Sequence, residues 1–202
     1  HAKFLKFKLS SYGFKVIEIE NNKKFFINND IFINIIAADN CDPALCYKFT
    51  GCAEKSITRG SQQIDSYAFI GNNKYTLLNI NDCPFELAKF SLKKNLKNFN
   101  KIDLLLTGYG GAGPYPQCFN NLKKNEKKEE ASLKKEKFLK MATDYIDLAQ
   151  PRYYLPFAGK YVLGGKLAKL NNLRGVPDLT EAYKFLEKYY IKKNCKNIKS
   201  LK

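Results

Sequence analysis

The feature that most constrains this chain is a strand–helix–strand pattern between residues 75 and 107. Residues 75–80 (YTLLNI) and 102–107 (IDLLLT) are near-continuous apolar runs, as expected of strands buried on both faces. Between them, apolar residues recur at helical spacing after Pro84, a residue that suits a first helical turn: Phe85, Ala88, Leu92 and Leu96. A helix that joins two buried strands makes them parallel, with a right-handed connection. The sequence therefore predicts a sheet of the α/β class with helices on it.

Short strands are expected before this unit. Apolar runs bounded by Asn-rich turns predict strands at residues 4–8, 14–19, 24–28 and 31–36, as a β-meander, and a hairpin from residues 66–70 and 75–80. Residues 37–63 have no clear period, and we expect them to form a long loop or lid.

Helices and one more strand are expected after it. The sequence predicts a long charged helix over residues 122–148, a strand near 153–155 and a last helix opened by the capping-box pair Asp178 and Glu181. Residues 191–202 are expected to be a frayed basic tail. No repeat or linker divides the chain, so residues 1–202 are expected to form a single domain with a mixed sheet.

The charge of the chain first suggests nucleic acid. Its net charge is +16, but only three of its 35 basic residues are Arg, and Trp is absent. A Lys-rich, Arg-poor composition is what an AT-rich genome gives to ordinary surfaces, and the Arg forks and stacking aromatics of nucleic-acid sites are missing. We therefore favour a small-molecule substrate over nucleic acid. No apolar run is long enough for a membrane helix.

The cysteines and the histidine narrow the chemistry. The six cysteines form no C-x-x-C pair, which argues against structural zinc. Cys41, Cys46 and Cys52 could hold a metal or a disulfide, but scattered reduced thiols in a cytoplasmic protein are the reading that we favour. The single histidine is His1, so no Ser–His or Cys–His nucleophile system can be built.

Three segments follow predicted strands, at the place where ligands collect in open α/β sheets. The first is Asn81-Asp82-Cys83, in which Asp82 could ligate a metal, act as a general base or cap the next helix. The second is GYGGAGPYP, residues 108–116, whose four glycines and two prolines indicate a binding loop without the Gly-Lys-Ser/Thr element of a phosphate loop. The third is PFAG, residues 156–159.

In this order, NINDC (79–83), IDLLLTGYGGAGPYPQCF (102–119) and YYLPFAG (153–159) resemble the C-terminal half of metallo-β-lactamase-fold proteins. The closest branch is that of CMP-N-acetylneuraminate hydroxylase-like and related metal-dependent hydrolase proteins, and the resemblance covers about residues 65–165. It implies an αββα sandwich with a metal site at one edge between two sheets. The family's His-x-His-x-Asp-His motif lies upstream of this region and is absent here. The chain is therefore expected to lack its N-terminal part.

The resemblance also implies a site. Asp82 matches a metal-ligating aspartate of the family, and Asp39 or Asp42 could stand in for an intermediate ligand, often His. The family's final His has no counterpart. Two divalent ions, zinc or iron, are implied for the complete protein. The expected substrate wall is made of residues from the glycine-rich loop: Tyr109, Gly110, Gly111, Tyr115 and Pro116.

These expectations give one leading function and two alternatives. The first is a metal-dependent hydrolase or hydroxylase-like enzyme that acts on a small molecule, with a nucleotide sugar or surface-glycan precursor implied by the branch alone. The second is a degenerate, non-catalytic binding domain of the same fold, which would hold no metal. The third is a basic nucleic-acid-binding protein or nuclease, which would bind unrelated DNA or RNA with a steep salt dependence.

Overall fold

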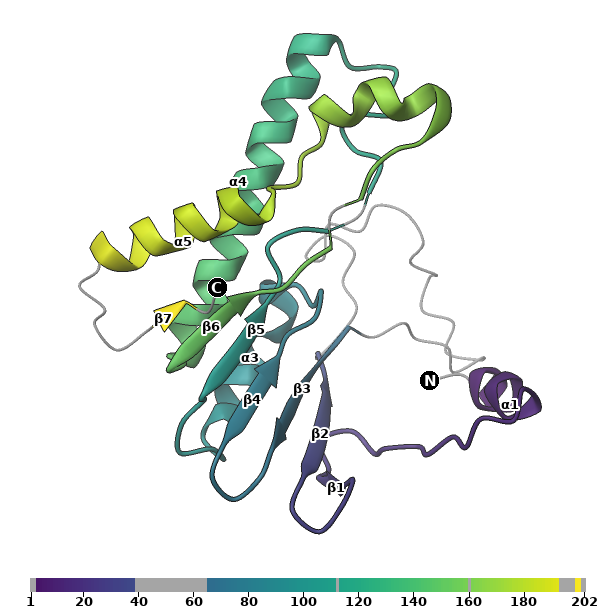
Figure 1. Ribbon diagram of the computed structural model, residues 1–202, viewed down its shortest axis with the longest axis vertical. Coiled ribbons are helices and arrows are strands. Elements are labelled where there is room, and N and C mark those ends of the chain that lie inside the picture. Colours follow the sequence, from purple (N-terminus) through teal and green to yellow (C-terminus); the bar gives the residue numbers. More distant parts are fainter. Residues whose placement is uncertain (1–2, 39–64, 112, 160, 193–198, 201–202) are drawn as a thin grey trace.

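The computed structural model describes residues 3–38, 65–111, 113–159, 161–192 and 199–200. They form a mixed α/β structure with one open sheet and helices on it (Figure 1). In chain order the elements are α1 (Lys3–Ser11), β1 (Phe25–Phe26), β2 (Phe32–Ala37), β3 (Ser66–Gly71), β4 (Thr76–Asn79), α3 (Phe85–Leu96), β5 (Leu104–Thr107), α4 (Lys124–Ala149), β6 (Tyr153–Pro156), the 3₁₀ helix η1 (Gly165–Leu173), α5 (Leu179–Lys192) and β7 (Lys199–Ser200).

The strands lie side by side in the order in which they occur in the chain, from β1 to β7. Pairing is antiparallel from β1 to β4 and parallel from β4 to β7. The predicted hairpin of β3 and β4 is confirmed, and so is the parallel pair β4 and β5 joined by α3. The same arrangement occurs twice more, because α4 joins β5 to its parallel neighbour β6 and α5 lies between β6 and its parallel neighbour β7.

A buried carboxylate fixes the register where β4 and β5 begin. The Oδ2 atom of Asp103 accepts a hydrogen bond of 2.9 Å from the backbone N–H of Thr76, and Lys101 Nζ lies 2.9 Å from its Oδ1 atom. Burial alone raises the pKa of Asp103, but the Lys101 ammonium and the Thr76 N–H outweigh burial and lower it. Asp103 is therefore held ionised between the two strands.

One face of the sheet carries the core. Phe69, Leu78, Leu105 and Tyr154 form a row across four strands, because each is in register with the next, and all are at most 2 % exposed. Helix α3 covers this face through Ser91, which accepts a hydrogen bond from Tyr67. Helix α5 covers it through Tyr190, whose ring packs on that of Tyr154 at 5.6 Å.

The opposite face is apolar as well but is covered by no helix among the described residues. Register places Ile70, Leu77, Leu104 and Tyr153 in one row, and the next row contains Leu106. These side chains are only half-buried. In Figure 1, α3 lies behind the sheet and α1 stands away from it. An aliphatic sheet face of this kind is normally packed against another layer.

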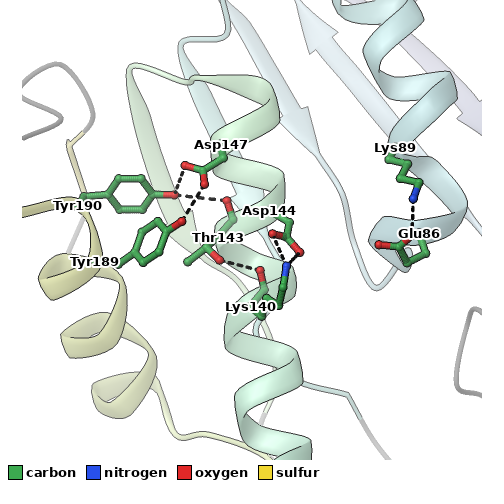
Figure 2. A network of polar contacts seen from close by, with 8 residues as sticks. All are labelled: Glu86, Lys89, Lys140, Thr143, Asp144, Asp147, Tyr189 and Tyr190. Atoms are coloured by element: carbon green, nitrogen blue, oxygen red, sulfur yellow. Dashed lines mark hydrogen bonds and ion pairs between the residues drawn. The ribbon is translucent and has the colours of Figure 1, made fainter. Parts of the chain in front are cut away.

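A polar network joins α5 to α4 (Figure 2). The hydroxyl of Tyr189 donates to Asp147 Oδ2 at 2.9 Å, and the hydroxyl of Tyr190 lies 3.4 Å from both Asp147 Oδ1 and the carbonyl oxygen of Thr143. Burial and the nearby Asp147 raise the pKa of Tyr190. The Asp147 side chain therefore accepts hydrogen bonds from two tyrosine hydroxyls of α5, and it anchors the last helix on α4.

The expected elements from residue 66 to residue 192 are present. The capping box of α5 is confirmed by reciprocal hydrogen bonds of 2.8 Å between Asp178 and Glu181. Helix α5 continues to Lys192, and Lys199–Ser200 pair with β6 as β7, inside the segment expected to be a frayed tail. The loop or lid expected at 37–63 lies almost entirely outside the described residues.

Of the four strands expected before residue 37, only the last is confirmed in full, because β2 covers the strand expected at 31–36. The strand expected at 4–8 is the helix α1, no strand covers 14–19, and only β1 represents the strand expected at 24–28. Alternating apolar residues form a strand only when another strand pairs with them, and no described strand lies beside this segment. Its apolar side chains stay exposed, with Leu5 at 50 % and Phe7 at 69 %.

None of the helices in the described ranges is long and apolar enough to cross a membrane.

Because the two faces of β5 are buried to different extents, we expect Leu→Ala to lower the free energy of unfolding by different amounts on each face. Leu105→Ala removes a fully buried side chain, so we expect it to lower the free energy of unfolding by about 2–5 kcal/mol. Leu106→Ala acts on the half-buried face, and we expect a loss of about 1–2 kcal/mol. Urea unfolding of both variants of this chain measures the difference. Equal losses would mean that the second face is as fully packed in solution as the first.

Candidate functional site

The candidate site is the sheet edge at which β4, β5 and β6 end. Because these strands are parallel, their C-terminal segments meet: Ile80 N donates to Leu106 O at 3.1 Å, and Phe157 N donates to Thr107 O at 2.8 Å. The expected convergence of the three segments is therefore confirmed. Strand β2 points the same way as β4, since two antiparallel pairings separate them. It ends at this edge too, but Asp39 and Asp42 lie outside the described residues.

Asp82 is exposed at this edge, in a tight turn after β4. The turn is set by Asn81, which has a φ of 55°, and by Asn79, whose side-chain oxygen accepts a hydrogen bond of 2.9 Å from Asn81 N. Asn81 Nδ2 donates to Asp82 Oδ1 at 3.1 Å. The expectation that Asp82 caps the next helix was wrong, because the N-cap of α3 is Pro84. The turn thus presents the Asp82 carboxylate outside the helix that follows.

The next residue, Cys83, is part of the core. Its side chain is fully buried, and its Sγ atom lies 3.9 Å from the carbonyl oxygen of Pro84. The backbone carbonyl of Cys83 accepts a hydrogen bond of 2.7 Å from the Tyr145 hydroxyl in α4. Burial raises the pKa of Tyr145 well above its ordinary value, so this phenol stays a donor. Cys83 therefore packs at the strand end, and the Tyr145 hydroxyl holds the turn from the side of α4.

Tyr109 links the ends of β5 and β6. Its side chain is only 4 % exposed, and its hydroxyl donates to Ala158 O at 3.2 Å. Burial raises its pKa, and the negative charge of Asp178 raises it further. Tyr109 was expected to line a substrate pocket. In the structure its side chain is buried and its hydroxyl donates to the segment that follows β6.

The glycines of the loop permit close packing within the protein. A Cβ atom on Gly110 would lie 2.7 Å from a methyl carbon of Val176, and one on Gly111 would lie 3.2 Å from the ring of Phe138. The glycines were expected to let the backbone approach a ligand. Gly110 and Gly111 instead let it approach Val176 and Phe138 of the protein itself. Here the loop is pressed against α4 and against the segment that precedes α5.

Helix α4 also holds the second half of the loop. The hydroxyl of Tyr115 donates to Glu130, and Lys134 Nζ donates to Tyr115 O at 2.8 Å. The bond to Glu130 raises the pKa of Tyr115 to about 12, whereas burial lowers the pKa of Lys134. Pro116 follows a cis peptide bond and is buried.

Three further contacts keep the loop in shape. The amide nitrogen of Gln117 donates to the hydroxyl of Tyr161, and this hydroxyl donates to Gly113 O at 2.9 Å. Lys127 Nζ donates to Gln117 O at 3.1 Å. The described part of the loop that was expected to line the substrate is thus held by hydrogen bonds from Tyr161, Lys127 and Lys134.

The described residues do not by themselves fit a metal centre. They contain no group of three or more His, Cys, Asp or Glu side chains that could hold an ion. Asp82 supplies one exposed carboxylate, and a stable divalent site needs several ligands. Any further ligand would have to come from outside the described residues.

Sequence reasoning missed the residues that buttress this edge from α4. Glu130 and Lys134 belong to the long charged helix predicted over residues 122–148, and Lys and Glu at helical spacing are typical of a face exposed to solvent. Their distance of 15 to 19 residues from Tyr115 left no local signal for these contacts.

No protein-family model matches the chain. No curated protein matches it either.

The bond between Tyr115 and Glu130 predicts a pH-dependent contribution to stability. Because the pKa of Tyr115 is raised in the folded state, its contribution is fully present below pH 10 and is lost as the pH rises through about 12. Tyr115→Phe is therefore expected to lower the free energy of unfolding by about 1–2 kcal/mol at pH 8.

Urea unfolding at pH 8 and at pH 11 checks this, with Tyr153→Phe as a control tyrosine on the other face of the sheet. The difference in the free energy of unfolding between Tyr115→Phe and the parent chain should be smaller at pH 11 than at pH 8. A difference that is absent at pH 8, or that widens with pH, would contradict the assignment.

Proposed function

We propose that this chain forms the C-terminal part of a cytoplasmic metal-dependent hydrolase, or hydroxylase-like enzyme, of the metallo-β-lactamase fold. The observation that carries the proposal is the convergence of the ends of β4, β5 and β6 on one edge, with Asp82 exposed there. These are the segments on which the resemblance rests, and strand ends of this kind are the usual ligand sites of α/β sheets.

The uncovered sheet face supports the αββα form of the fold. The row Ile70, Leu77, Leu104 and Tyr153 is apolar and half-buried, and α3, α4 and α5 lie on the other side. Two sheets pack face to face at about 10 Å when both inner faces are apolar. A second sheet would therefore complete the layer order helix, sheet, sheet, helix, with the Asp82 edge at the rim of the interface.

In this proposal Asp82 is one ligand of a divalent ion, zinc or iron, and the complete protein holds two. Such ions activate bound water and polarise a substrate oxygen. Since Asp82 is the one ligand that we assign among the described residues, no reaction step is derived from this chain. The contribution of its own residues is to fix the Asp82 turn through Asn79, Asn81 and Tyr145.

The substrate in this proposal is a small molecule, with a nucleotide sugar or surface-glycan precursor taken from the resemblance alone. The glycine-rich loop and Phe157 would border it. Phe157 follows β6 and is 51 % exposed, so it offers an apolar surface beside the Asp82 edge. The buttressing of the loop by α4 supports a wall of fixed shape rather than a moving flap.

Replacing Asp82 tests the metal role. Asp82→Asn keeps the oxygen that accepts from Asn81 but removes the charge, so the turn should persist while metal affinity falls. We expect the metal content of the complete protein, measured by plasma mass spectrometry, to fall by about one ion or more per chain. Hydrolysis of a nucleotide sugar should fall with it.

Asp30→Asn is the matched control, because Asp30 precedes β2 and lies at the opposite edge of the same sheet. Its metal content should match that of the parent protein. Unchanged metal and activity in Asp82→Asn would remove Asp82 from the site. A complete protein without any bound metal would favour the non-catalytic binding domain instead.

A further inference from the structure

A groove on the helical side of the sheet is lined in part by the end of β2 but by none of the segments that follow β4, β5 and β6. It has a volume of about 360 Å³, which falls in the range of small-molecule sites. Its walls are the turn Asn21–Asn22 before β1, the last residues of β2, and the second half of α3. The side chains used below come from this lining: Asn21, Asn22, Phe90, Ser91, Lys94 and Asn95.

The Asn21–Asn22 turn is held in one shape by β2. Asn22 has a φ of 56°, and its backbone N–H donates to Ile35 O at 2.9 Å. The Oδ1 atom of Asn21 accepts a hydrogen bond of 2.9 Å from Ala37 N. The Oδ1 atom of Asn22 accepts one of 3.3 Å from the buried side chain of Asn34. Both side-chain oxygens thus accept hydrogen bonds inside the protein, and the N–H of Ala37, which can only donate, fixes the orientation of the Asn21 amide.

What remains at the groove is a set of donors. The Nδ2 groups of Asn21 and Asn22 and the Nζ atom of Lys94 bond to no acceptor among the described residues. Ser91 Oγ donates to Ala88 O and Asn95 Nδ2 donates to Ser91 O, so Asn95 sets one acceptor, its Oδ1 atom, against the three donor groups. No Asp or Glu lines the groove. Two amide groups and one ammonium are the chemistry that binds an oxyanion.

An aromatic side chain adjoins these donors. The ring of Phe90 lines the groove and is 69 % exposed, and Ile36 and Ala37 add apolar surface. An exposed phenyl ring beside a cluster of donors can stack on a flat ring of a ligand whose anionic group meets the donors.

We infer that this groove binds a small organic anion in which a phosphate or carboxylate is attached to a flat ring. The anionic group contacts Asn21, Asn22 and Lys94, and the ring lies on Phe90. The inference is independent of the metal role of Asp82, since none of these residues belongs to the strand-end edge.

Phenyl phosphate is the probe. Inorganic phosphate tests the anionic group without the ring, and phenol tests the ring without the anionic group. Titrations of the full chain by calorimetry at low salt should give saturable binding of phenyl phosphate, tighter than either part. Asn21→Asp keeps the oxygen that accepts from Ala37 and replaces the NH₂ donor by a charged oxygen. It should weaken phenyl phosphate about tenfold or more, as should Lys94→Met. Phe90→Leu should weaken phenyl phosphate and leave inorganic phosphate unchanged.

Lys93→Met is the matched control, because Lys93 is an equally exposed neighbour on α3 that does not line the groove. It should change affinity by about twofold or less. Circular dichroism checks that each variant is folded. If Lys93→Met weakens binding as much as Lys94→Met, general positive charge explains the effect and the inference fails. The inference also fails if the parent chain shows no saturable binding of phenyl phosphate.

Discussion

The structure depends first on the parallel pairing of β4, β5 and β6. Asp103 sets the register of the first pair by accepting a hydrogen bond from Thr76 N, and the backbone bonds then carry that register to β6. Parallel neighbours need helical crossovers, so α3 and α4 must both return along the sheet. Parallel strands also end at the same edge. The convergence of the Asp82 turn, the glycine-rich loop and the segment after β6 follows directly from this pairing.

Helix α4 turns that convergence into a fixed surface. Its residues reach two of the three strand-end segments: Tyr145 donates to the carbonyl of Cys83, Lys134 donates to the carbonyl of Tyr115, and Glu130 accepts from the Tyr115 hydroxyl. The helix in turn is held to α5 by Asp147 and two tyrosines. The contacts that hold the loop at this edge therefore come from α4, a helix that packs on the core face of the sheet.

The two faces of the sheet are both apolar but are not equally covered. This asymmetry supports the proposed fold, because an apolar sheet face without a covering helix is suited to packing against a second sheet. The phosphate or carboxylate groove lies on the covered side, where β2 and α3 diverge around the Asn21–Asn22 turn. It and the Asp82 edge are separate features of one sheet, and each can be disabled without touching the other.

Much of the sheet could be predicted from the sequence, because strands such as LLLT in β5 and the capping box of α5 are local patterns. The strand-end position of Asp82 follows from the same patterns together with the rule for parallel sheets. The N-terminal alternation was misleading, since residues 4–8 and 14–19 look like strands but have no described strand to pair with.

The sequence by itself thus determined the order of elements from β3 to α5 and the edge at which Asp82 lies. Tertiary structure alone decided that Tyr109 is buried, that the loop glycines face Val176 and Phe138, and that Asn21, Asn22 and Lys94 border one groove. The physical reason is the sequence separation over which each interaction acts. Hydrophobic period and capping act over a few residues, whereas these contacts join residues far apart in the chain, and their partners are set only when the helices pack on the sheet.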